Sequence, residues 1–314
     1  MANEKLMMGR RSFIGGSIAA AALTALAGCG KKGGSASGDK SGGSKGGTLK
    51  FYINEPVAID PYNTQESEGG QVEHNLFDPL TTFDWKTHKV VPLAAESWDI
   101  SDDGLTYTFH LVQGATFHNG DKVDSQSFKR GWERIASPKM KTPSQISFHL
   151  SPIAGYEEFH SGKADSISGL SCPDENTFEV KLTAPMYDFP YVAACIALVP
   201  VPQAAVDSPD DFLLAPIGNG PYQMDGKWES GQKIVLKRYD NYYGSKKANL
   251  DSIVFSIQKD PNTAYREFEA GNMDFCAVPT GRLKENIDKY GQSADGDTVT
   301  PDKQVLTGPT LGVY

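Results

Sequence analysis

The spacing of hydrophobic and polar residues along this chain changes several times, and it predicts strands in some segments and helices in others. Residues 49–53, LKFYI, are followed by polar residues and prolines, as is typical of a strand that leads into a loop. Similar short apolar patterns predict further strands at 80–84, 97–100, 105–111, 177–183, 250–258, 274–278 and 304–314. Residues 221–228 and 233–239 predict a hairpin.

A spacing of three and four residues between apolar positions predicts helices elsewhere. The clearest runs through Phe128, Trp132 and Ile135, with Asp124 as its expected N-cap. Another carries Val72 and Leu76. Weaker helical patterns occur at 156–159, 187–195, 262–270 and 281–290.

The order of these elements predicts the fold class. Strand, helix and strand follow one another from 250 to 278, which favours a β-α-β unit. Between 80 and 111 strands follow strands, and Asp102-Asp103-Gly104 marks a turn between two of them. We therefore expect a mixed α/β fold with a partly antiparallel subdomain.

The first 28 residues have the pattern of an export signal. Arg10-Arg11 precede a stretch of small apolar residues that ends at Cys29 and is too short to span a hydrocarbon layer about 30 Å thick. Residues 26–29, LAGC, resemble the lipobox of bacterial lipoproteins, in which the cysteine is acylated, and residues 10–14, RRSFI, resemble a twin-arginine signal. We expect a cleaved signal peptide over 1–28 and a lipid such as palmitate on Cys29. An ordinary signal with a chance cysteine and a chance arginine pair is the alternative.

Residues 29–47 predict a lipidated cysteine followed by a tether. Residues 30–47 contain only Gly, Ser, Lys, Ala and Asp, so they have little apolar surface to bury. A flexible segment of this composition has an r.m.s. reach of about 23 Å. The protein is thus expected on the outer face of the cell membrane, with its folded part beginning near Thr48.

Composition and charge exclude several function classes. The net charge of −9 and the pI of about 5.2 argue against a nucleic-acid partner. The six histidines show no HExxH spacing and the chain has no CxxC, so neither a metal nor a cofactor is expected. Residues 42–46, GGSKG, fit G-x-S-x-G only formally, because the strand-to-helix context of a nucleophile elbow is absent. No catalytic residue is assigned, and we expect no enzyme.

Three cysteines lie beyond Cys29: Cys172, Cys195 and Cys276. Outside the cytoplasm a disulfide is permitted, and the odd number leaves at least one thiol free. Cys172 and Cys195 flank the predicted strand at 177–183, so a disulfide between them is one expectation. The other is that the cysteines are small buried residues.

Several separated motifs, in the correct order, give the chain a strong resemblance to one family. They are EPVAIDP at 55–61, AESW at 95–98, DDGLTYTFHL at 102–111, FHNGD at 117–121, FKRGWER at 128–134, PIGNGPY at 216–222, YYG at 242–244, LDSI at 250–253 and EAGNMD at 269–274. Together they resemble the extracellular solute-binding proteins, family 5, of ABC transporters, the oligopeptide- and dipeptide-binding type. The one small departure is Val112, where relatives commonly carry a basic residue.

The resemblance implies a periplasmic-binding-protein-like fold of class II, in which two lobes close on a ligand like a Venus flytrap. It assigns 48–84 and 197–314 to an incomplete lobe I, and 85–196 to an inserted extra subdomain. Relatives continue into a second lobe, so the resemblance implies a chain truncated at its C-terminus. The carboxylate that receives a peptide's amino group in the family would lie in that missing part.

The resemblance also implies a function. A membrane-anchored member binds oligopeptides or dipeptides, often as an added strand, and delivers them to the permease subunits of an importer. The loop after Asp60-Pro61 corresponds to the segment of the first lobe that faces the cleft. Its polar residues are the candidate ligand contacts: Thr64, Gln65, Glu66 and Ser67.

Other functions remain open at this stage. One alternative is a nickel-, haem- or sugar-binding member of the same family. Another is a sensor or adhesin lipoprotein that does not transport, from a truncated gene. An extracellular hydrolase is disfavoured because no supported triad, zinc motif or carboxylate pair is present.

Overall fold

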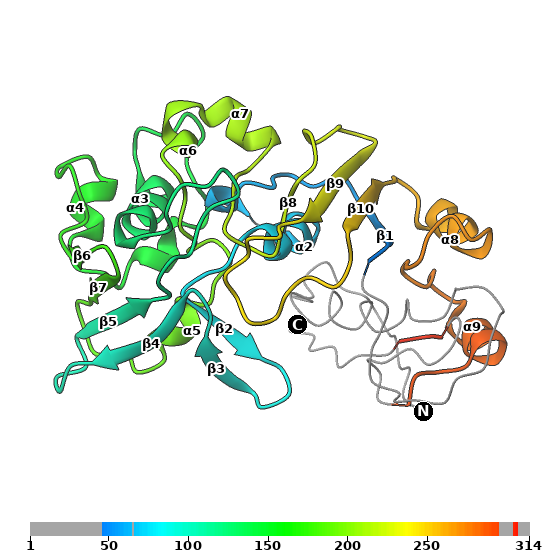
Figure 1. Ribbon diagram of the computed structural model, residues 1–314, viewed down its shortest axis with the longest axis horizontal. Helices are drawn as coiled ribbons and strands as arrows, with labels where there is room; N and C mark the ends of the chain where they lie inside the picture. Colours follow the sequence, from blue (N-terminus) through cyan, green and yellow to red (C-terminus); the bar gives the residue numbers. More distant parts are fainter. Residues whose placement is uncertain (1–45, 65, 295–303, 307–314) are drawn as a thin grey trace.

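The computed structural model describes residues 46–64, 66–294 and 304–306. This part of the chain contains two four-stranded sheets and a separate hairpin, with helices packed around them (Figure 1). The lipidation candidate Cys29, the signal segment and most of the predicted strand at 304–314 lie outside the described residues.

The first sheet combines a parallel and an antiparallel part. Its strands, in spatial order, are β1 (Thr48–Ile53), β10 (Ser252–Ile257), β9 (Lys233–Arg238) and β8 (Tyr222–Met224). β1 pairs with β10 in parallel, and the other neighbours are antiparallel. Side chains from β1, β10 and the helix α2 (Ser67–Leu76) share one buried cluster that includes Phe51, Val72, Leu76 and Phe255.

The second sheet is antiparallel throughout. Its strands are β4 (Ala95–Ile100), β5 (Thr106–Leu111), β7 (Thr177–Lys181) and β6 (Leu170–Asp174). Buried residues alternate in β5 because one face packs on the core and the other is more exposed. The turn before β5 is made at Gly104, whose φ of 69° lies in the left-handed region that glycine tolerates.

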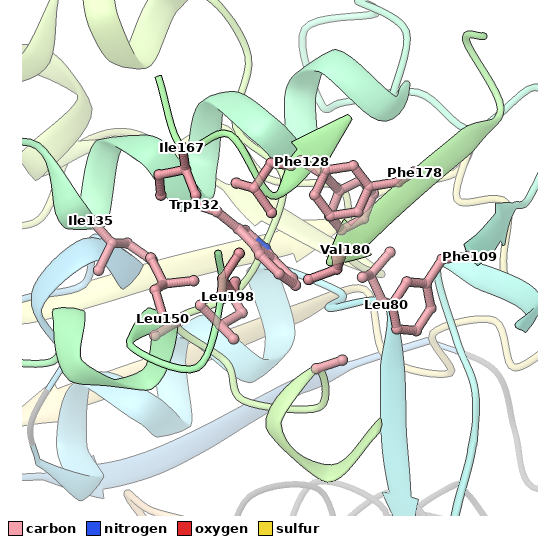
Figure 2. Packing of buried hydrophobic residues seen from close by; sticks show 14 of the residues in the cluster. Leu80, Phe109, Phe128, Trp132, Ile135, Leu150, Ile167, Phe178, Val180 and Leu198 are labelled. Atoms are coloured by element: carbon pink, nitrogen blue, oxygen red, sulfur yellow. The ribbon is translucent and has the colours of Figure 1, made fainter. Parts of the chain in front are cut away.

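Helix α3 (Ser125–Ala136) covers the inner face of the second sheet. Trp132 is fully buried, and its ring meets Phe178 edge to face with 5.1 Å between centroids. Figure 2 shows Trp132 at the centre of this cluster, with Phe178 on the neighbouring strand. The helix begins at Asp124, whose side chain accepts from the Ser127 N–H while Ser127 Oγ accepts from the Asp124 N–H. This capping box and the apolar stripe explain why the sequence predicted the helix well.

A glycine in α3 lets another segment cross the helix closely. A Cβ on Gly131 would lie 2.1 Å from the backbone oxygen of Val199. The segment that carries Val199 is also held by hydrogen bonds from the Val201 N–H to the Ser127 carbonyl and from Arg130 to the Val201 carbonyl. Gly131 is therefore required by packing and not by an unusual backbone conformation.

The remaining elements are a hairpin and several short helices. The hairpin consists of β2 (Thr81–Asp84) and β3 (Lys89–Pro92). The helices are α4 (Tyr156–His160), α5 (Phe189–Val192), α6 (Ala204–Asp207), α7 (Pro209–Leu214), α8 (Pro261–Glu269) and α9 (Leu283–Tyr290), with 3-10 turns at Pro61–Asn63 and Ser147–Leu150.

The structure differs from the sequence-based expectations in several places. Strands β3 and β6 were not predicted, and the helix expected at 187–195 is confined to Phe189–Val192. The strand expected at 274–278 is reduced to one bridge between Phe51 and Phe275. The strands of the first sheet lie in 48–84 and 197–314, and those of the second lie in 85–196. The boundary placed between residues 84 and 85, however, cuts the β2–β3 hairpin, whose strands pair with each other.

The expected disulfide between Cys172 and Cys195 is not formed. Both residues are free, half-buried thiols that pack against the core around α3. Cys172 lies on β6 beside Ser125, whereas Cys195 lies near Glu73 of α2, so the two thiols have different neighbours. Burial raises the pKa of both thiols, as in small buried cysteines that react slowly.

Candidate functional site

The parallel strands β1 and β10 end at the same edge of the first sheet. Their register pairs Ile53 with Ile257, so Asn54 and Gln258 follow directly at that edge. The Gln258 N–H donates to the Ile53 carbonyl at 3.1 Å, which holds the two strand ends together. Ligands of open α/β sheets bind outside the carboxyl ends of parallel strands, so this edge is where a ligand site is expected.

A chain of polar side chains links this edge to the start of α2. The Tyr52 hydroxyl donates to Asn54 Oδ1 at 2.9 Å, and Asn54 Nδ2 donates to Glu68 Oε1 at 2.7 Å. The Ser67 hydroxyl donates to the other Glu68 oxygen at 3.0 Å. Burial pushes the pKa of the Glu68 carboxyl upward, but the hydrogen bonds from Asn54 and Ser67 outweigh it and leave the pKa below its usual value. Glu68 is therefore a fixed, ionised acceptor at neutral pH.

Glu66 holds the loop before α2 in place. Its carboxylate caps the helix by accepting from the Gly69 N–H at 2.8 Å, and it also accepts from the Val57 N–H at 3.0 Å. Burial raises the pKa of this carboxyl in spite of both backbone bonds. Glu66 thus joins the 55–58 loop to the helix, and its oxygens are already used within the fold.

Thr64 is likewise engaged internally. Its hydroxyl donates to the carboxylate of Glu73, which is fully buried on α2. Burial raises the pKa of Glu73 well above its usual value, and the hydrogen bond from Thr64 opposes this shift. The pair fixes the end of the loop onto the middle of the helix.

A buried ion pair anchors the same loop to α3. Arg134 donates from both terminal nitrogens to Asp60, at 2.7 and 2.6 Å, and the two side chains are 5% and 0% exposed. The guanidinium lies 4.9 Å from the ring centroid of Tyr62 and 5.3 Å from that of Phe212. Such a planar, bidentate arrangement is specific to arginine. Because α3 packs on the second sheet, this pair couples the position of the loop to that sheet.

Two side-chain amide oxygens have no hydrogen-bond partner among the described residues. They are Oε1 of Gln71 on α2 and Oε1 of Gln258 at the sheet edge, and both atoms are buried. A buried acceptor without a donor is costly, so each atom marks a place where the packing of the described residues leaves a polar group unsatisfied. The Glu68 carboxylate is an accessible, half-buried acceptor at the edge, whereas the Gln258 oxygen lies below the surface.

The predicted ligand contacts thus have different roles in the structure. Thr64 and Glu66 serve the fold, Ser67 belongs to the polar chain at the edge, and Gln65 lies outside the described residues. Asn54, Glu68 and Gln258 were not singled out by the sequence analysis. The local signal for Asn54 was its place directly after a predicted strand, whereas the pairing of β1 with β10 joins segments far apart in the sequence.

The described ranges contain no group of three or more His, Cys, Asp or Glu side chains that could hold a metal ion. Among the helices described, none has the length and apolar character that a membrane span requires.

Comparison with known proteins identifies the family of the chain. Residues 89–309 match the model of the bacterial extracellular solute-binding proteins, family 5, middle region. The dipeptide-binding protein DppE of Bacillus subtilis is 31% identical over 297 residues, which are 92% of this chain and 53% of DppE. A probable deoxycholate-binding periplasmic protein of Escherichia coli, YgiS, is 28% identical over 73% of this chain and 43% of its own length.

Solved structures give the same fold. Haemophilus influenzae OppA in complex with the peptide RPPGFSPFR superposes with a TM-score of 0.70 and 26% identity, covering 78% of this chain and 49% of OppA. The agropinic-acid complex of AgaA from A. tumefaciens gives a TM-score of 0.67 and 30% identity, covering 77% of this chain and 46% of AgaA. The chain spans about half the length of the curated relatives it matches. With a family model that matches most of its length, the chain belongs to the bacterial extracellular solute-binding proteins of family 5.

Proposed function

We propose that this chain is the peptide-binding component of an ABC importer. It holds a short peptide outside the cell and delivers it intact to the permease. The observation that carries the proposal is the shared carboxyl end of β1 and β10, where Asn54 and Gln258 follow the paired strand ends and Asn54 holds the Glu68 carboxylate.

A peptide suits this surface because its backbone supplies N–H donors at regular intervals. The Glu68 carboxylate offers oxygens at the edge, and Asn54 orients it through a 2.7 Å hydrogen bond. Binding requires no bond to break, and the proposal assigns no catalytic residue. The names of DppE and of the OppA–peptide complex support a peptide ligand, whereas those of YgiS and AgaA show that relatives bind other solutes.

The proposal includes a lipid anchor. Cys29 would carry it, and the Gly/Ser-rich segment after it would hold the folded part beside the membrane and its permease. The support is the sequence alone: the lipobox-like LAGC at 26–29 and the tether composition. A sensor or adhesin role would keep the anchor but need no permease.

The test is titration of the ¹⁵N-labelled chain with a mixed tri- to pentapeptide library, followed by NMR. Because the chain matches about half of each relative, we expect weak binding, with Kd on the order of 1 mM. Backbone shifts should change at Asn54, Glu68 and Gln258, and the peptides should be recovered uncleaved.

A matched pair of variants sharpens this test. Glu68→Gln removes the carboxylate at the edge, whereas Glu285→Gln removes one from the first turn of α9. We expect Glu68→Gln to abolish the shifts and Glu285→Gln to preserve them. Shifts confined to other surfaces, cleaved peptides, or equal behaviour of the two variants would contradict the proposal.

A further inference from the structure

The β2–β3 hairpin carries an exposed tryptophan at its tip. Trp85 follows directly after β2 and is 46% exposed. Its ring meets Phe83 edge to face at 4.7 Å, which supports the indole from below. Figure 1 shows the hairpin extending from the body beside the loop between β9 and β10. The hairpin thus presents an aromatic side chain at the protein surface.

Exposed lysines lie on this hairpin and on a neighbouring loop. Lys86 and Lys89 are exposed on the same hairpin. Lys246, also exposed, comes from the loop between β9 and β10. The Asp84 pKa is lowered by the N–H groups of Lys86 and Thr87 and, more weakly, by the charge of Lys246, which places that lysine near the hairpin. We call Trp85, Lys86, Lys89, Lys246 and Lys247 the basic aromatic patch.

The described part of the chain begins next to the loop that carries Lys246 and Lys247. The Gly46 N–H donates to the Asn249 carbonyl at 2.8 Å, and the Gly47 N–H donates to Asp251 at 2.8 Å. Gly46 and Lys247 line the same surface hollow. The tether from Cys29 therefore enters the fold at the loop that carries Lys246 and Lys247.

We propose that the basic aromatic patch rests on an anionic lipid surface, the bilayer that holds Cys29, and orients the protein on it. The proposal rests on the lipid anchor of the proposed function. The tether, with an expected reach of about 23 Å, joins the fold at the loop that carries two of the patch lysines.

The chemistry of the patch favours lipid over an acidic protein surface. Tryptophan is enriched at the membrane–water interface because its ring is apolar and its N–H is polar. Each lysine near an anionic membrane strengthens binding by about fivefold. The patch is cationic although the whole chain carries a net charge of −9, so attraction to the membrane is local and orients the molecule.

Vesicle sedimentation tests the patch in the absence of a covalent lipid on Cys29. The full chain carries Cys29→Ser, so no variant is acylated and all share the same leader. The patch variant is Trp85→Ala, Lys86→Glu and Lys89→Glu. The control is Phe148→Ala, Lys139→Glu and Lys141→Glu, which removes an exposed aromatic ring (59% exposed) and two exposed lysines from another segment.

With vesicles of phosphatidylglycerol the control should bind as the parent does, and the patch variant should bind at least tenfold more weakly. Salt should weaken parent binding, and vesicles of phosphatidylcholine alone should not support it. Brominated lipid should quench emission of the parent more than that of a Trp85→Phe variant, which places the indole in the bilayer interface.

Equal binding by the patch variant and the control would overturn the proposal. So would binding that ignores lipid charge, or a patch that cross-links in cells to an acidic protein and not to lipid. Failure of palmitate labelling at Cys29 would instead overturn the anchor and would leave the vesicle result standing by itself.

Discussion

The ion pair between Asp60 and Arg134 is expected to be the interaction that most strongly fixes the loop before α2. The two side chains are 0% and 5% exposed and form two hydrogen bonds, at 2.7 and 2.6 Å. Removing one partner leaves the other charge buried and unpaired, which typically costs about 3–5 kcal/mol. Replacing both with groups of similar volume costs much less, because no isolated charge remains.

A double-mutant cycle tests this reasoning. Asp60→Asn keeps an oxygen that can cap the 3-10 turn at Tyr62, and Arg134→Met keeps an apolar stem between the rings of Tyr62 and Phe212. Urea unfolding followed by circular dichroism gives the free energy of unfolding of each variant. We expect each single change to cost about 3–5 kcal/mol and the double variant to cost no more than one of them, a coupling energy of about 3 kcal/mol.

The control is an ion pair of similar length on the surface. Lys284 and Asp288 lie 2.8 Å apart and are 88% and 64% exposed, so Lys284→Ala should leave the urea midpoint unchanged. Single changes at Asp60 and Arg134 that simply add in the double variant would refute the account, since additivity would mean that the two side chains act independently.

Three further predictions concern pH, packing and the anchor. Burial lowers the pKa of His118 to about 4, and the ring accepts the Gly218 N–H, so between pH 7 and pH 5 the unfolded chain binds a proton at this histidine that the folded chain does not. The free energy of unfolding should therefore fall by about 2 kcal/mol over this range relative to that of a His118→Gln variant. Burial raises the pKa of Asp78 to about 6, which has the opposite effect on stability, but that effect is the same in both proteins and cancels. Urea unfolding at both pH values checks this, and parallel curves for the two proteins would contradict it. Gly131→Ala should cost at least about 2 kcal/mol, since the new methyl group would lie 2.1 Å from a backbone oxygen of the segment that crosses α3, and a fully stable variant would show that this segment moves aside. Cys29→Ser should abolish palmitate labelling and partition into detergent, and labelling that persists would place the lipid elsewhere.

Much of the fold followed from local sequence signals. Helix α3 was predicted because Asp124 caps it and Trp132 lies on an apolar stripe that ends before Pro138. The motifs that carried the family resemblance also acquire physical reasons. The aspartate of EPVAIDP and the last arginine of FKRGWER are Asp60 and Arg134, which meet in the buried ion pair.

The elements that were missed lack such signals. β3 (Lys89–Pro92) buries no residue fully, and β6 (Leu170–Asp174) buries only Leu170, so neither shows the alternation of a half-buried strand. The strand expected at 274–278 fails for a different reason. The Asp274 side chain accepts the Lys50 N–H at 2.8 Å, so a side chain takes the place of the next ladder bond.

The candidate site was only partly predictable. The sequence resemblance pointed to the loop at 64–67, and the structure shows that Thr64 and Glu66 there hold the fold together. Asn54 and Gln258 reach the same edge through parallel pairing of two strands that are far apart in the chain, which no local pattern reveals. Asn54 comes directly after β1, and its position at a strand end was the only local hint.

The central claim is that the edge shared by β1 and β10 binds peptides, and NMR titration with tri- to pentapeptides tests it most directly. The account predicts saturable shifts at Asn54, Glu68 and Gln258 with uncleaved peptide, lost in Glu68→Gln and kept in Glu285→Gln. Saturable shifts confined to residues away from this edge would contradict it. So would the absence of any shift at peptide concentrations well above about 1 mM.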